Sequence, residues 1–296
     1  MKGIIRGGGQ GTRLHPSTKA VNKNLYPVYD KPAIYYPISL LIMAGVTDIL
    51  IGVSAEHQEA YYRLLGDGSR FGINISYFIE ERTMTPPEMF LQCRSFIGTD
   101  SVVVALGDNI FVGEDIRQTL EDAAENFEKT KGATVFCKEV DDPWNYGVVE
   151  YKGDGSICSL ESKPRIPKSN NAVTGLFFFD DTLFEVIGRT KPAEDGSIVL
   201  ADLLVEYLRD GRLNSVLLNE GIQWFDAGTP ERLYLASGAV RAFQQSHETL
   251  AGSIEEAAFE KGLIDRNRLS ELAADMSAVP LGQYLAELAQ KPVRCE

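Results

Sequence analysis

A glycine-rich loop near the start of the sequence, followed by two basic residues, is typical of a site for phosphate groups. The loop reads Gly-Gly-Gly-Gln-Gly-Thr-Arg over residues 7–13 and directly follows a short apolar run. Glycine lets the backbone approach a ligand closely, so that successive N–H groups can surround phosphate oxygens. Arg13 ends the loop and Lys23 lies ten residues further on. These two cations can stand over a triphosphate bound on the loop.

The glycines alone leave another interpretation open, which is a tight strand-to-helix turn that binds no ligand. They lack the third glycine of a dinucleotide-binding loop, which disfavours a dinucleotide-dependent oxidoreductase. They also lack the Lys-Ser/Thr end of a Walker loop, because Arg13 stands there. It is the pair of cations, Arg13 and Lys23, that favours phosphate binding.

Two aspartates follow apolar segments and could hold a divalent cation. Asp108 comes after the apolar run 102–106, at the carboxyl end of an expected strand, where ligands bind in open α/β sheets. Asp226 follows Trp224 and Phe225. Hard oxygen ligands at two strand ends suit Mg²⁺, which also takes phosphate oxygens from a substrate. Taken singly, either aspartate could instead be a helix cap or a turn residue.

The elements that position these residues alternate between strands and helices. Short apolar runs alternate with amphipathic segments, which predicts an α/β domain with a mostly parallel sheet. The expected strands of the first part are residues 3–6, 48–53, 73–78 and 101–106. The expected helices there are residues 34–44, 56–65, 88–96 and 114–129.

The pattern of apolar, polar and turn residues changes after Gly132 and again after Pro230. Between them the pattern is β-rich, with strands expected at residues 133–140, 147–151, 156–160 and 173–179. No linker precedes this region, so we expect it to add strands to the same sheet. The expected helices after Pro230 are residues 233–246, 254–261, 267–273 and 281–289.

Composition and charge narrow the possible partners. With 29 Lys+Arg against 42 Asp+Glu, the net charge of −13 argues against nucleic acid or a membrane surface, although a small basic pocket remains possible. The start of the sequence leaves no room for a signal peptide, and the longest apolar stretch, 38–46, is too short to span a bilayer. We expect a cytoplasmic chain whose cysteines, Cys93, Cys137, Cys158 and Cys295, are free and mostly buried.

The motifs occur in the order found in the sugar-1-phosphate nucleotidylyltransferases, and the chain resembles the glucose-1-phosphate thymidylyltransferases among them most closely. The resemblance rests on residues 7–16, Lys23, and residues 27–32, 35–37, 64–68, 106–109, 146–150, 172–176, 224–226 and 282–285. It covers essentially the whole chain.

This resemblance implies a three-layer, Rossmann-like nucleotidyltransferase fold with a mixed, mostly parallel central sheet and a helical C-terminal extension. It implies a catalytic core over residues 1–229, with a nucleotide-binding half at 1–131 and a sugar-binding half at 132–229. Residues 230–296 would serve packing or a subunit interface. Family members are typically homotetramers with a nucleotide-sugar regulatory site between subunits, so we expect a homo-oligomer.

The implied reaction is attack by a sugar 1-phosphate, glucose 1-phosphate or a related sugar, on the α-phosphorus of a nucleoside triphosphate, with dTTP favoured. Such a reaction needs alignment of two polyanions and neutralisation of their charge. By resemblance, Arg13 would neutralise the departing pyrophosphate, Lys23 the α-phosphate and Lys163 the sugar phosphate. Asp108 and Asp226 would hold Mg²⁺. Without the resemblance, Lys163 could be an ordinary exposed lysine.

The resemblance also implies which residues contact each substrate. The nucleotide-binding residues would be Gly7, Gly8, Gly9, Gly11, Thr12, Arg13, Lys23, Glu80 and Thr85. The sugar-phosphate-binding residues would be Asn109, Tyr146, Gly147, Glu161, Ser162, Lys163 and Val173.

Several residues depart from the family pattern at the positions that recognise substrates. Glu80 stands where an amide would meet the base, and an ionised carboxylate accepts hydrogen bonds but cannot donate them. Ser162 replaces a glutamate that contacts sugar hydroxyls, and Asp195 replaces an arginine that helps to hold the sugar phosphate. A different base or weaker base discrimination is one hypothesis. Another is reduced attraction for the sugar phosphate, because a cation has become an anion.

Two further hypotheses concern compensation and function. Arg6, Arg165 or Arg189 could supply the lost positive charge, and Arg6 also brings an additional cation to the glycine loop. A regulatory or scaffold protein that binds nucleotide without turnover is the alternative to an enzyme. The retained cations and aspartates favour the enzyme.

Overall fold

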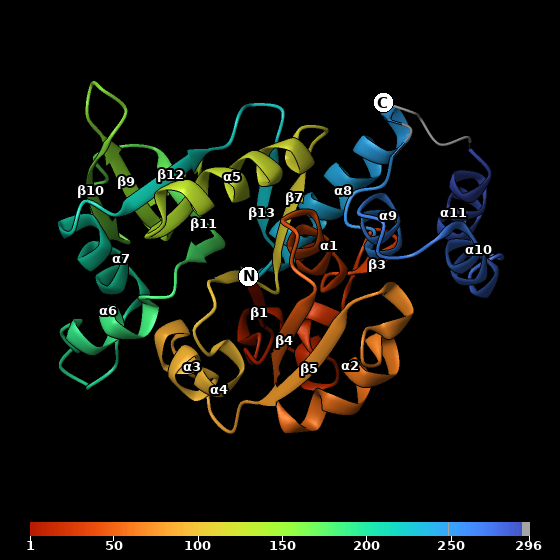
Figure 1. Ribbon diagram of the computed structural model, residues 1–296, viewed down its shortest axis with the longest axis horizontal. Coiled ribbons are helices and arrows are strands. Elements are labelled where there is room, and N and C mark those ends of the chain that lie inside the picture. The colour runs from red at the N-terminus through yellow and green to blue at the C-terminus, as the bar shows by residue number, and fades with distance from the viewer. Residues whose placement is uncertain (248, 292–296) are drawn as a thin grey trace.

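A nine-stranded mixed sheet forms the centre of the computed structural model, which describes residues 1–247 and 249–291 (Figure 1). The strands of this sheet are β1 (Lys2–Arg6), β4 (Asp48–Val53), β5 (Asn74–Ile79), β6 (Val102–Leu106), β8 (Ala133–Glu139), β9 (Gly147–Tyr151), β10 (Ile157–Ser162), β11 (Asn171–Phe179) and β12 (Leu213–Leu217). Its main path has the order β10-β9-β11-β6-β1-β4-β5, and β8 pairs with β11 and β12. Two smaller ladders join β2 (Pro27–Val28) to β3 (Lys31–Pro32) and β7 (Asn109–Val112) to β13 (Gln223–Asp226).

The strand β11 joins the two parts of the sheet, because it pairs with β6 of the first part and with β8 and β9 of the second. The strands β6, β1, β4 and β5 are parallel to one another, and β11 pairs with β6 in the antiparallel sense, with Leu176 opposite Ala105. The expectation that the second region adds strands to the first sheet is therefore confirmed. Each strand expected from the sequence is present within two residues at either end.

Helices pack on both faces of the sheet. They are α1 (Tyr35–Met43), α2 (Gln58–Leu65), α3 (Pro86–Gln92), α4 (Arg94–Ile97), α5 (Ile116–Thr130), α6 (Leu183–Arg189), α7 (Leu200–Arg209), α8 (Pro230–Ser246), α9 (Ile254–Glu260), α10 (Arg266–Asp275) and α11 (Pro280–Gln290). Successive strand residues point to opposite faces. Ile5 and Ile51 accordingly pack with α1, α2 and α5, whereas Ile4 and Leu50 pack with α3, α4, α6 and α7.

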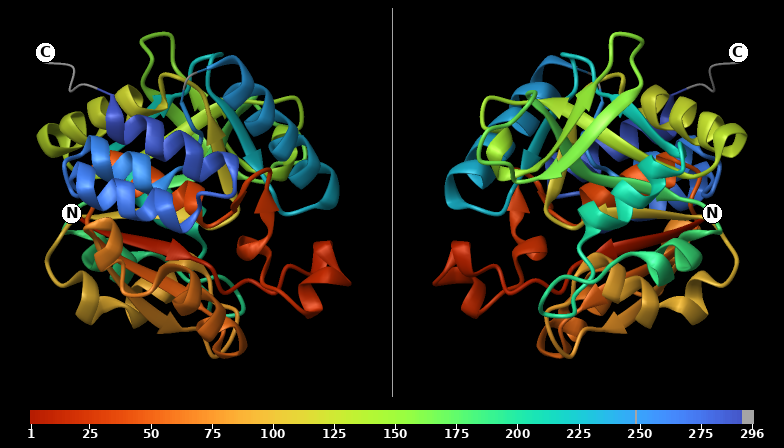
Figure 2. Two further views of the ribbon diagram at one scale, coloured as in Figure 1. Left: turned by 90° about the vertical axis from the view of Figure 1, so that its right-hand side faces the viewer. Right: turned by 90° about the vertical axis from the view of Figure 1, so that its left-hand side faces the viewer.

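The helices α9, α10 and α11 extend the first of these two cores. Their buried residues Ile254, Leu269 and Leu285 belong to the same hydrophobic cluster as α1 and the sheet. In the left view of Figure 2 these helices, in blue, lie together on the side of the molecule that faces the viewer. The helical C-terminal extension expected from the sequence is thus present and packs on the core.

The structure corrects several expectations. The single helix expected at 88–96 is wrong, because the structure forms α3 and α4, which meet at Cys93. The region after Gly132 also contains α6 and α7, which the β-rich sequence pattern does not predict. The strands β7, β12 and β13 were missed as well. Cys93 and Cys137 are buried as expected, Cys158 is exposed, and Cys295 lies outside the described residues.

Within residues 1–247 and 249–291, no helix has both the length and the apolar composition needed to cross a bilayer.

Candidate active site

The pairing of β7 with β13 brings together two aspartates that are far apart in the sequence. Asp226, the last residue of β13, lies opposite Asn109, and the N–H of Ala227 donates to the carbonyl of Asp108 over 2.9 Å. Both carboxylates border the same cavity. The two residues that the sequence assigned to one cation site are therefore neighbours, at the carboxyl end of β6.

Three basic side chains approach these two carboxylates. Lys23 Nζ forms an ion pair with Asp108 Oδ2. Arg13 Nη2 lies 3.8 Å from Asp226 Oδ2, and Arg232 Nη1 lies 3.5 Å from the same oxygen. Cations fixed in this way beside a cavity can stabilise charge that develops on a bound phosphate.

The pKa values of the two aspartates shift in opposite directions. Burial alone would raise the pKa of Asp108, but the charge of Lys23 and the hydrogen bonds from Lys23 and Asn109 outweigh it and lower that pKa. Burial, together with the charge of Asp108, raises the pKa of Asp226 against the surrounding cations. The ionised form of Asp108 is therefore favoured, whereas that of Asp226 is disfavoured, and a further cation close to Asp226 would favour it.

Asn109 fixes the geometry around the aspartates. Its amide Nδ2 donates to Asp108 Oδ1 over 3.2 Å. Its Oδ1 accepts from the N–H of Gly175 over 3.0 Å and from the indole N–H of Trp224 over 2.6 Å. Gly175 leaves the room for this amide, because an added Cβ would lie 2.5 Å from Asn109 Cγ. One side chain thus connects β7, β11 and β13.

The glycine loop is tied to the ends of the strands and places Lys23. The N–H of Gly7 donates to the carbonyl of Gly52 over 2.9 Å. The side chains of Asn22 and Asn24 donate to the carbonyl of Gly7 over 3.0 and 3.2 Å. Asn22 Oδ1 also caps the short 3-10 turn that begins at Lys23. These bonds hold the Lys23 backbone beside the loop, from which its side chain reaches Asp108.

A cavity of about 340 Å³ collects most of the catalytic residues expected from the sequence. The expected residues that line it are Gly9, Arg13, Lys23, Asp108, Asn109, Tyr146, Lys163, Val173 and Asp226. Arg6 also lines it, and its Nη2 donates to the carbonyl of Met84 over 2.6 Å. Residues from both halves of the sheet therefore meet at one cavity.

A second cavity, also of about 340 Å³, shares Gly9 with the first. Gly8 and Glu80 are among its lining residues, but both carboxylate oxygens of Glu80 are buried, and neither has a hydrogen-bond partner in the described part of the chain. The carboxylate packs against Gly8 and Gly52, where an added Cβ would come within 2.6 Å of it. Burial raises the pKa of Glu80, although the charge of Arg6 opposes this shift.

Seven of the expected contact residues border neither of these two cavities. They are Gly7, Gly11, Thr12, Thr85, Gly147, Glu161 and Ser162. Thr85 caps α3, since its Oγ1 accepts from the N–H of Glu88 over 3.4 Å. Glu161 Oε1 instead pairs with Lys168 over 2.6 Å.

Lys163 enters the cavity from an uncommon backbone conformation. Its φ is +47°, a region that non-glycine residues seldom adopt and that is frequent at functional sites. Its N–H donates to the carbonyl of Tyr146 over 2.7 Å. The side chain of Tyr146 is itself packed on Trp224, with ring centroids 4.9 Å apart. Burial raises the pKa of Tyr146 to about 12, so its hydroxyl stays protonated.

Of the arginines that could replace the lost charge, Arg6 lines the cavity, whereas Arg165 and Arg189 lie elsewhere, as does Asp195. Asp195 is in an exposed turn, where its Oδ1 accepts from the N–H and hydroxyl of Ser197. Arg189 pairs with Asp210, and Arg165 is exposed. None of Asp195, Arg165 and Arg189 lines the cavity. Arg232 instead reaches Asp226. No sequence pattern predicts this role, because a lone arginine early in a helix is usually a solvated residue.

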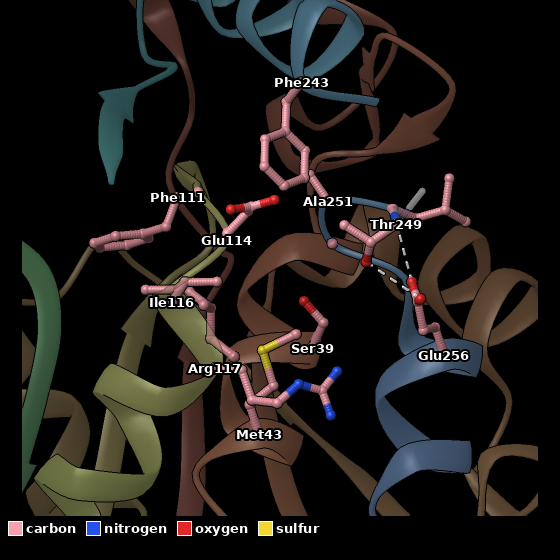
Figure 3. A pocket seen from close by; sticks show the side chains of 14 residues that line it. Ser39, Met43, Phe111, Glu114, Ile116, Arg117, Phe243, Thr249, Ala251 and Glu256 are labelled. Carbon is pink, nitrogen blue, oxygen red and sulfur yellow. Dashed lines mark hydrogen bonds between the residues drawn. The ribbon is translucent and has the colours of Figure 1, made fainter. Parts of the chain in front are cut away.

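A third cavity is smaller and more acidic. It measures about 50 Å³ and lies beside α1, the start of α5 and the segment before α9 (Figure 3). Its charged groups are Glu114, Arg117 and Glu256. Arg117 is paired with Glu260, and Glu256 accepts from the N–H of Leu250 over 3.2 Å. The larger cavity with its several cations is therefore the better candidate for a reaction between phosphates.

Comparisons with known proteins agree with this fold. The family model described as nucleotidyl transferase matches residues 2–242. Glucose-1-phosphate thymidylyltransferases of Neisseria meningitidis and Mycolicibacterium smegmatis are 44% and 41% identical, each over 98% of this chain and 100% of the relative. A Bacillus anthracis structure described as a glucose-1-phosphate thymidylyltransferase, in complex with sucrose, is 36% identical with a TM-score of 0.75, covering 81% of this chain and 95% of that one.

The fold and the cations around the cavity are those of a nucleotidyltransferase class of protein. The chain belongs to the nucleotidyl transferase family. Its full-length relatives carry the name glucose-1-phosphate thymidylyltransferase, which confirms the family that the sequence motifs indicated.

Replacing Asn109→Ala should destabilise the protein by about 2–4 kcal/mol, because it leaves the N–H of Gly175 and the indole N–H of Trp224 without their acceptor. Urea unfolding followed by tryptophan fluorescence measures this. Asn74→Ala is the matched control, since Asn74 is exposed and bonds only at the surface. A loss below about 1 kcal/mol for Asn109→Ala would show that these bonds do not anchor the site.

Replacing Glu80→Gln should increase the free energy of unfolding relative to the wild type, and increasingly so as pH rises. The pKa of Glu80 is raised in the folded protein, so the wild type loses folding free energy as pH rises from the ordinary pKa of the carboxyl to that raised value, and glutamine avoids this loss. Unfolding of both proteins at pH values from about 4 to 8 measures the difference. The exposed neighbour variant Glu81→Gln is the control. A difference that does not change with pH would contradict the prediction.

Proposed function

We propose that this protein transfers a nucleotidyl group from a nucleoside triphosphate to a sugar 1-phosphate, giving a nucleoside-diphosphate sugar and pyrophosphate. The single observation that carries the proposal is the convergence of Arg13, Lys23, Lys163, Asp108 and Asp226 on one cavity. The names of the relatives support glucose 1-phosphate as the acceptor and dTTP as the donor.

The chain's own residues align and neutralise the substrates. The acceptor phosphate is already an anion, so no side chain need remove a proton from it. The loop N–H groups and Arg13 bind the triphosphate and stabilise the pyrophosphate as it departs. Lys23 neutralises the α-phosphate, and Lys163 draws the acceptor phosphate in line with it. Fixed cations at both ends of the reacting phosphorus lower the repulsion between two polyanions.

The donor set at the aspartates fits a magnesium ion. Asp108 and Asp226 present carboxylates to the same cavity, and the charge of Asp108 already disfavours ionised Asp226, which a cation would relieve. No cluster of three His, Cys, Asp or Glu ligands occurs within the described ranges. Mg²⁺ suits a two-carboxylate site because it takes its remaining ligands from water and phosphates. Bound there, it would neutralise phosphate charge.

The remaining assignments are proposals of the same kind. We assign residues 1–131 to the nucleotide-binding half, 132–229 to the sugar-binding half and 230–296 to packing or an interface between subunits. The cluster shared by α1 and α9–α11 supports a packing role. We propose a homo-oligomer, in line with the family, and a cytoplasmic location, where nucleoside triphosphates are available.

Pyrophosphate release tests this function. The protein is incubated with Mg²⁺ and each pairing from a panel of nucleoside triphosphates and sugar 1-phosphates. We expect release with at least one pairing, and a loss of at least about 100-fold in Asp226→Asn, because the carboxylate that faces Asp108 is gone. Nucleotide binding by calorimetry without release from any pairing would replace this proposal with the regulatory one.

A further inference from the structure

Arg232 joins three polar groups at the wall of the catalytic cavity. It lies in the first turn of α8, where its N–H is capped by Thr229 Oγ1 over 3.3 Å. Its guanidinium donates to the hydroxyl of Tyr146 and to Asp142 Oδ2, and its Nη1 lies 3.5 Å from Asp226 Oδ2. Tyr146 and Asp226 both line the cavity. The guanidinium is therefore at the edge of the space that substrates would occupy.

The distribution of cations around this cavity is uneven. Among the described residues, its basic lining residues are Arg6, Arg13, Lys23 and Lys163, and only Lys163 of these comes from the chain after residue 131. The part of the site that would take the acceptor thus has one lining cation for a doubly charged phosphate. Asp195 cannot supply a second, because it is acidic and lies in an exposed turn.

Arg232 has the chemistry and the place to supply that second charge. Its guanidinium carbon lies 5.2 Å from the centre of the Tyr146 ring, and the Tyr146 ring packs on Trp224, so the arginine is held against a rigid wall. Because the Tyr146 oxygen accepts from Arg232, its own proton is free to point elsewhere. A planar guanidinium binds phosphate oxygens in pairs, which a lysine cannot do.

The carboxylate of Asp226 shows that the space between Arg13 and Arg232 holds an anionic group. Its Oδ2 lies between two guanidiniums, those of Arg13 and Arg232, while its Oδ1 accepts from the N–H of Gly228 over 3.1 Å. The 3.5 Å separation from Arg232 is long for a charged hydrogen bond. A phosphate oxygen next to Asp226 would therefore meet an arginine that Tyr146 and Asp142 hold in place and whose contact with Asp226 is loose.

We infer that Arg232 binds the phosphate of the sugar 1-phosphate together with Lys163, and that the Tyr146 hydroxyl donates to the same acceptor. This inference rests on the proposed function. It makes α8 a part of the acceptor site. It also explains how the site keeps a second positive charge although Asp195 replaces the arginine of the family pattern.

Binding of glucose 1-phosphate tests the inference. Its Kd is measured by calorimetry in the presence of Mg²⁺ and a non-hydrolysable nucleoside triphosphate, and its KM is measured by pyrophosphate release. In Arg232→Gln we expect both constants to rise about tenfold, with the KM of the triphosphate changed less than twofold. Arg232→Lys should recover part of the affinity, because it keeps the charge but loses the paired geometry.

Arg189→Gln is the matched control, since Arg189 also forms an ion pair but lies outside the cavity wall. An unchanged Kd and KM for glucose 1-phosphate in Arg232→Gln would overturn the inference, even if kcat fell, because a merely structural arginine would affect turnover alone. If Arg232→Gln does not fold, the Kd and KM of Arg232→Lys for glucose 1-phosphate decide instead: a rise in both supports the inference, and unchanged values overturn it. Wild-type protein that binds glucose 1-phosphate but releases no pyrophosphate would overturn the proposed function instead, and the Kd values would still decide the role of Arg232.

Discussion

Two carboxylates held next to each other are the constraint on which this site depends. Asp108 and Asp226 are fixed as neighbours by the β7–β13 ladder, partly buried, where their mutual repulsion is weakly screened. Nearby cations offset this repulsion: Lys23 pairs with Asp108, and two arginines, Arg13 and Arg232, lie next to Asp226. The same cations that stabilise the aspartates in the free protein are then in place to meet phosphates. The same ion pairs therefore stabilise the fold at this site and provide the cations for substrate binding.

The scaffold keeps these ion pairs in place by making the cavity rigid. Asn109, the residue after Asp108, is hydrogen-bonded to β11 and β13. Asn22 and Asn24 are hydrogen-bonded to Gly7 and so fix the loop next to Lys23. Because catalysis here needs alignment rather than a nucleophile made by the protein, this rigidity is itself the main contribution of the fold. The acidic surface implied by a net charge of −13 leaves the cavity as a local basic region.

The sequence could predict the elements with a local pattern and the residues in recognisable motifs. It located every strand of the main sheet except β12, and it named nine of the residues that line the cavity. It missed β7 and β13, because each has four residues and their pairing is visible only in three dimensions. It missed α7 although Leu203, Leu204 and Tyr207 have helical spacing, since the region read as β-rich. Arg232 carries no motif, and Glu80 proves to be packed under the loop with both oxygens buried.

Counting bound Mn²⁺ by electron paramagnetic resonance, with a non-hydrolysable nucleoside triphosphate present, tests the central claim most directly. Mn²⁺ takes the same oxygen ligands as Mg²⁺. We expect one tightly bound ion per wild-type chain, and an affinity at least about tenfold weaker in Asp108→Asn and in Asp226→Asn, since each variant removes one of the two carboxylates. Wild-type affinity in both variants would contradict this expectation, because the ion would then be held by the nucleotide alone.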